Sequence, residues 1–106
     1  MPDLGDFASN LGEDALNEVK ESLGDAWDEV TEAERDSIKR VAKRYFELKL
    51  EEKLGKDVSR QLQVVKASTV NWRVVGAISL EKAFWRGVQK VATVLAGFLV
   101  AGLAAL

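Results

Sequence analysis

The most constraining feature of this chain is the run of sixteen residues from Val91 to Leu106, which contains no charged side chain. Apart from Thr93, the run consists of Val, Leu, Phe, Ala and Gly. Exposing so much contiguous apolar surface to water is unfavourable, and a soluble monomer rarely does so. This apolar segment therefore has to be covered, either by the hydrocarbon of a bilayer or by other protein.

A cluster of basic and aromatic residues precedes the apolar segment. It consists of Lys82, Phe84, Trp85, Arg86 and Lys90. Trp beside Lys and Arg is typical of a membrane–water interface, and basic flanks favour the cytoplasmic side. As a helix, the apolar segment spans roughly 24 Å, whereas a bilayer core is about 30 Å thick. Crossing is therefore credible if the helix includes Val88 and Lys90 extends its ammonium to the interface.

The alternative interpretation is a helix buried by neighbouring subunits of a large assembly. The small residues of the apolar segment permit close helix approach in protein as well as in lipid. Two environments thus stay open: a membrane, with the N-terminal region cytoplasmic, or an assembly such as a virion. The residues expected to make the membrane or assembly contacts are the same in both cases: Trp85, Arg86, Lys90, Val91, Leu95, Phe98, Leu99 and Gly102.

Charge is strongly segregated along the chain although the net charge is only −2. Residues 1–34 hold eleven acidic side chains and one base, and residues 35–56 hold eight bases and four acids. Residues 57–106 add six bases and two acids. This distribution indicates a molecule with an acidic end, a basic middle and a basic flank to the apolar segment.

Each of two charged clusters can be interpreted either as a binding site or as a solvent-exposed helix face. Lys39, Arg40, Lys43 and Arg44 form a basic patch suited to anionic phosphates, but interleaved acids favour a solvated helix face. Four acids, Asp25, Asp28, Glu29 and Glu32, share helical spacing. They lack the calcium-binding loop with a Gly at its sharp turn, so a solvated face is favoured. This face could also dock onto the basic middle of a neighbouring subunit. Nucleic acid, metal and cofactor are not expected partners.

The reactive side chains that most enzymes use are scarce. The sequence has no Cys and no His, which removes thiol catalysis, the commonest general base and the commonest transition-metal ligand. No Gly-rich phosphate loop and no framed Ser–Lys motif is present. We therefore expect a non-enzymatic protein.

Helical spacing of apolar residues dominates from Glu13 onward, and no strand alternation is visible. Thr31 and Glu34 form a capping box, and Gly55 suits a helix C-terminus. The expected fold is all-α, with helices over 13–29, 31–54, 58–78 and 80–106 and a break near Ser79. Residues 1–12 are expected to form a loose arm, 13–79 a charged amphipathic region, and 80–106 the apolar helix, with oligomerisation completing the bundle.

The layout of a charged helical region, a basic flank and a short apolar end resembles that of small membrane-active or virion-associated proteins of phages. The resemblance rests on size and layout alone. It implies a self-associating helical protein whose C-terminal helix inserts into a membrane. The alternative is a structural subunit whose apolar helix is wrapped by its partners.

Overall fold

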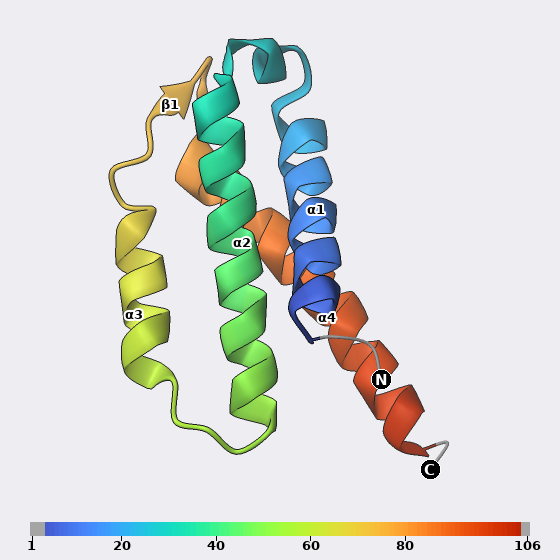
Figure 1. Ribbon diagram of the computed structural model, residues 1–106. Coiled ribbons are helices and arrows are strands. Elements are labelled where there is room, and N and C mark those ends of the chain that lie inside the picture. Colours follow the sequence, from blue (N-terminus) through green and yellow to red (C-terminus); the bar gives the residue numbers. More distant parts are fainter. Residues whose placement is uncertain (1–3, 105–106) are drawn as a thin grey trace.

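The computed structural model describes the backbone of residues 4–104 and the side chains of residues 6–94. It confirms the all-α fold with about four helices, to which a small β-hairpin is added (Figure 1). The elements are α1 (Leu4–Leu23), the 3-10 helix η1 (Gly24–Glu29), α2 (Glu32–Lys53), α3 (Ser59–Ser68), β1 (Val74–Val75), β2 (Ile78–Ser79) and α4 (Leu80–Ala104).

Helix α1 begins at Leu4, which corrects the expectation of a loose arm over residues 1–12. Ala8, Leu11 and Ala15 follow one another at helical spacing, and all three are buried. Small residues are needed here because α2 lies close: a Cβ atom on Gly12 would sit 3.2 Å from the backbone nitrogen of Lys43. Part of the segment that was expected to be loose is therefore the packing face of a helix.

One main core lies where α1, α2 and α4 meet. Its fully buried members include Val19 of α1, Ile38 and Phe46 of α2, and Phe84 of α4. Helix α4 crosses behind α1 and α2, and its later turns extend away from the other helices (Figure 1). We call the packed part of the molecule, up to Val91 of α4, the head.

Helix α3 is attached to α2 through a second, smaller cluster. Leu48 of α2, Val58 and Val65 are buried together, with Leu62 packed against them. The apolar face of α3 is thus covered by α2, which gives the edge of the head a two-helix layer.

The end of the first predicted helix is different from the expectation. Instead of continuing to residue 29, α1 ends at Leu23 and Gly24 adopts a positive φ of 56°. Only glycine enters this left-handed region readily, so the chain turns there into η1. Trp27 of η1 is buried and the Arg35 guanidinium lies 4.5 Å above its ring. The chain therefore bends at Gly24, at the boundary between two helices.

The third predicted helix is shorter than expected. Instead of reaching residue 78, α3 ends at Ser68, and the chain forms an antiparallel hairpin in which Val74 pairs with Ser79 and Val75 with Ile78. Gly76 supplies the positive φ of 61° that the turn requires. β-branched residues are frequent in this stretch and favour extended backbone. The predicted break near Ser79 is the junction between β2 and α4.

The predicted capping box is confirmed and also anchors the hairpin. The Thr31 backbone N–H donates to Glu34 Oε1 over 2.9 Å, and the Glu34 N–H donates to Thr31 Oγ1 over 3.1 Å. Arg73, just before β1, donates from Nε to Glu34 Oε2 over 2.7 Å and from Nη2 to Oε1 over 2.9 Å. Arg73 also donates to the Glu29 carbonyl. The Glu34–Arg73 pair thus joins the start of α2, the end of η1 and the hairpin.

Stability should depend on the protonation of Glu34. Hydrogen bonding to Arg73 holds the pKa of Glu34 at about 2, below its usual 4.5. A lowered pKa stabilises the fold above pH 4.5, and this contribution is lost as the pH falls towards 2. Glu34→Gln should therefore lower the urea midpoint at pH 7, and the difference from the wild type should shrink towards pH 2. A constant difference between the two proteins across this range would contradict the assignment.

Candidate assembly surface

Trp85 packs against other elements of the head and is not an exposed member of the basic and aromatic cluster. Its ring packs edge to face against Tyr45 of α2 and Phe84, with centroids 5.4 and 4.8 Å apart. Its indole nitrogen donates to Thr69 Oγ1 over 3.0 Å, and Thr69 is fully buried. The partner residues come from α2 and from the end of α3. Trp85 therefore links α4 to α2 and to the end of α3, and its side chain is only partly exposed.

The next turns of α4 are held by α1. Lys90 Nζ lies 3.3 Å from Glu18 Oε2, and Val88 and Val91 are buried in the main core. A Cβ on Gly87 would lie 3.0 Å from Glu18 Cβ and 3.1 Å from the Ala15 carbonyl oxygen, so the two helices are in close contact. Arg86 is exposed. The described part of α4 is thus packed against α1 as far as Val91.

Most of the predicted contact residues of the apolar segment fall outside the described side chains. The backbone around Leu95, Phe98, Leu99 and Gly102 is helical and continues α4. Their side chains are not among those that the structure describes. Within the described residues, no helix is both long and apolar enough to cross a bilayer.

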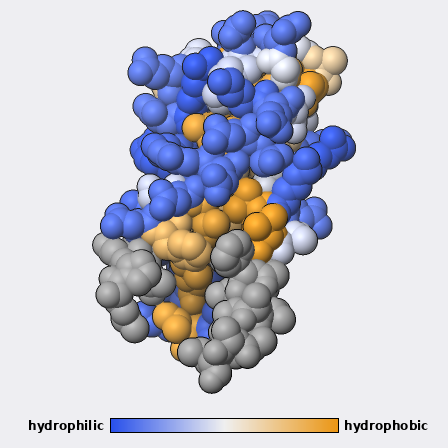
Figure 2. All heavy atoms as spheres, turned by 90° about the vertical axis from the view of Figure 1, so that its right-hand side faces the viewer, coloured by the Kyte–Doolittle hydropathy of each residue, from blue (hydrophilic) through white to orange (hydrophobic). Residues whose placement is uncertain are grey.

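An apolar groove opens between α1 and α4 where α4 leaves the core. It has a volume of about 580 Å³ and is lined by Phe7, Leu11, Val91 and Val94. Phe7 is 38% exposed and Val94 64% exposed. Hydrophobic side chains gather in the lower half of this side of the molecule, below a mostly hydrophilic surface (Figure 2).

The rim of this groove is polar. Asp14, Asn17 and Glu18 border it from α1, and Lys90 borders it from α4. An apolar floor inside a polar rim is the usual composition of a protein–protein contact. The α1/α4 groove has this composition.

Sequence reasoning missed most of this groove, since only Lys90 and Val91 of its lining were among the predicted contact residues. Phe7 and Leu11 were placed in a loose arm, whereas Val91 was predicted as a contact residue. The signal was present: Leu4, Phe7 with Ala8, Leu11 and Ala15 follow the 3–4 spacing of a helix. The row of apolar residues at helical spacing that begins at Leu16 only needed to be continued towards the N-terminus.

The charged clusters occupy separate surfaces. The four acids of the predicted acidic face are exposed in and just after η1. Lys39 pairs with Glu13 of α1 over 2.9 Å, and Arg44 lies 3.5 Å from Glu47. In the part of the chain that the structure describes, no group of three or more carboxylates is arranged to hold a metal ion.

Comparison with known proteins gives no relative. No protein-family model, no curated protein and no solved structure matches this chain. Its function has to be argued from the geometry of the α1/α4 groove and from the apolar segment.

Proposed function

We propose that this chain is a non-enzymatic, self-associating helical protein that acts as a structural subunit of a larger assembly. In this proposal the head is a folded base, and α4 carries the apolar segment from it into contact with neighbouring subunits. The observation that carries the proposal is the α1/α4 groove. Its exposed floor of Phe7 and Val94 continues along α4 into a stretch of sequence without charge.

The contacts between the head and the first turns of α4 favour neighbouring protein over lipid as the surroundings of the apolar segment. Val88 and Val91 pack in the core, and Lys90 contacts Glu18. These are the residues that a membrane-crossing helix would need to extend its apolar length and to place a cation at the interface.

Insertion into a membrane is the second candidate. The absence of charge from Val91 to Leu106 supports it, because residues after Val91 are apolar enough to enter hydrocarbon. In that case the groove would lie at the bilayer surface, with α4 entering the lipid directly below it.

A charge placed in the groove tests the assembly proposal. Val94→Glu alters an exposed groove residue, so the head should stay folded. Self-association should weaken by about tenfold or more, because an unpaired buried charge costs at least the roughly 1.4 kcal/mol that a tenfold change requires. Sedimentation velocity in detergent-free buffer measures the change, and circular dichroism checks the fold.

The matched control is Gln89→Glu, which adds the same charge at an exposed position of the same helix, outside both the groove lining and the apolar segment. It should leave association close to that of the wild type. Equal weakening by both variants, or by neither, would contradict the groove as a contact. Flotation of the wild type with liposomes, together with a monomeric state in buffer, would favour the membrane candidate instead.

A further inference from the structure

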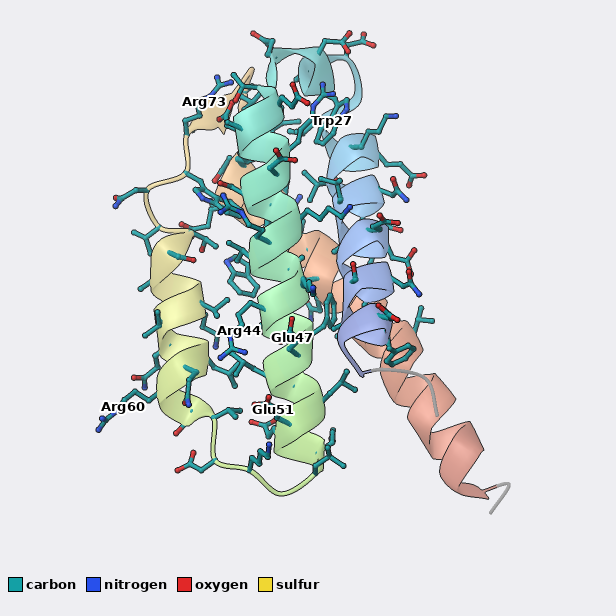
Figure 3. All side chains as sticks on the ribbon, viewed as in Figure 1. Trp27, Arg44, Glu47, Glu51, Arg60 and Arg73 are labelled. Atoms are coloured by element: carbon teal, nitrogen blue, oxygen red, sulfur yellow. The ribbon has the colours of Figure 1, made fainter. Side chains whose placement is uncertain are left out.

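A second groove lies on the opposite edge of the head, between α2 and α3. Its volume is about 260 Å³, and its walls include Arg40, Arg44, Val64 and Ser68. Arg44 extends from α2 on the side that faces α3 (Figure 3). Val64 is 65% exposed, so the groove combines an uncovered apolar surface with two guanidinium groups one helical turn apart.

The two arginines have little to neutralise them. Arg40 donates to Ser37 Oγ over 3.4 Å, and among the described side chains Arg44 has only the 3.5 Å contact with Glu47. Both lie in a region of positive charge, since residues 35–70 contain ten bases and five acids. The groove therefore attracts an anionic partner, and its guanidinium groups match the geometry of carboxylates and of phosphates.

The same chain carries a surface of opposite character. The turn from the end of α1 through η1 to the start of α2 exposes the carboxylates of Glu21, Asp25, Asp28 and Glu32, and none of the four forms an ion pair within the described residues. We call this turn the acidic tip. It caps one end of the head (Figure 1), whereas the groove lies along the side of the head, between α2 and α3, and no residue of the tip lines it. The tip of one molecule therefore does not cover its own groove.

We propose that copies of this chain associate head to tail, with the acidic tip of one copy seated in the Arg40/Arg44 groove of the next. The two surfaces are complementary in charge, and one protrudes where the other is hollow. Such a contact uses two different surfaces of each copy, so it repeats from copy to copy into a row or a ring. It involves neither the α1/α4 groove nor the apolar segment and thus does not rest on the proposed function.

A second copy fits the groove better than nucleic acid does. The whole chain has a net charge of −2, and the acidic tip would repel a phosphate backbone. The groove also has apolar walls from Val41, Val64 and Val65, which phosphates cannot use. Carboxylates on a compact turn can reach the guanidinium groups while the backbone of that turn covers the valines.

The absence of Cys from the sequence allows a direct test by disulfide crosslinking of the full chain. Ser22→Cys places a thiol beside the acidic tip and Ser68→Cys places one in the groove, and both positions are exposed. When the two variants are mixed in low salt under mild oxidation, the Ser22→Cys/Ser68→Cys heterodimer should form about tenfold faster than either homodimer, because opposite charges steer association. Gln89→Cys, on the exposed side of α4, is the control partner and should show no preference.

Charge reversal tests the contact itself. Arg40→Glu with Arg44→Glu in the Ser68→Cys chain should abolish the preference, and Asp25→Arg with Asp28→Arg in the Ser22→Cys chain should restore it. Lys53→Glu with Lys56→Glu changes the net charge equally at exposed positions outside the groove and should leave the preference intact. In 1 M salt, where the Debye length falls to about 3 Å, the preference should also fall.

Three outcomes would overturn this proposal. The first is a heterodimer no more abundant than the homodimers. The second is an equal loss of preference from the Arg40/Arg44 reversal and from the Lys53/Lys56 reversal. The third is displacement of the tip by low concentrations of duplex DNA or phosphatidylserine vesicles. Sedimentation of the same samples reports association through the apolar segment separately. Loss of the crosslink with retained self-association would thus refute the tip contact and leave the proposed function standing.

Discussion

Replacing Phe84 with alanine should lower the free energy of unfolding by about 3–5 kcal/mol, the usual cost of truncating a buried phenylalanine. Phe84 is fully buried in the main core and its ring packs edge to face against Trp72 and Trp85, with centroids 5.0 and 4.8 Å apart. Since small domains are stable by only about 5–15 kcal/mol, this loss approaches the whole stability of the head. Urea unfolding followed by tryptophan fluorescence and circular dichroism measures it.

Two controls separate this effect from a general sensitivity to lost apolar area. Phe84→Leu keeps most of the volume and should cost markedly less than Phe84→Ala. Phe7→Ala removes the same side chain from a position that is 38% exposed and should also cost less. If Phe7→Ala and Phe84→Ala shifted the midpoint equally, Phe84 would not be the centre of the core.

The parts of the fold that could be predicted are those set by residues close in sequence. The capping box of Thr31 and Glu34 depends on residues three apart, so it located the start of α2 to within one residue. Gly55, with a φ of 93°, likewise ended the helix where it was expected. Local hydrogen bonds and backbone sterics determine both ends, and both are visible in a short window of sequence.

The parts that could not be predicted depend on residues far apart. Arg73 contacts Glu34 across 39 positions, and nothing in either neighbourhood indicates the other. The hairpin has two residues in each strand, too few for a pattern with a period of two to appear. A tertiary contact and a single turn at Gly76 therefore replaced what helix periodicity suggested.

The interpretation of Trp85 shows the same limit at the candidate site. Its neighbours in sequence, Lys82 and Arg86, are basic, and that context suggested a membrane interface. Its neighbours in space are Tyr45 and Thr69, which come from other elements and bury much of the indole. Sequence context identified an amphipathic side chain correctly but could not say that other protein supplies its apolar surroundings.

Replacing Gly87 with valine should separate α4 from α1 and lower the free energy of unfolding by about 1–3 kcal/mol, as overpacking usually does. Gly87 is buried, and even a Cβ atom would meet Glu18 Cβ at 3.0 Å and the Ala15 carbonyl oxygen at 3.1 Å. Valine has a better intrinsic helix propensity than glycine, so a loss of stability would have to come from the helix contact. Gln89→Val, at an exposed position of the same helix, is the matched control and should cost little.

The same variant distinguishes the two candidate functions. The assembly proposal predicts weaker self-association, and the membrane candidate predicts more binding to liposomes. Moving α4 away from α1 releases Val88 and Val91 from the core and deforms the α1/α4 groove. If the groove is an assembly contact, Gly87→Val should weaken self-association in detergent-free buffer, as Val94→Glu does. If α4 enters a bilayer, two more apolar residues become available to lipid and liposome flotation should rise. Increased flotation with unchanged self-association would therefore refute the assembly proposal, whereas weaker self-association without increased flotation would support it.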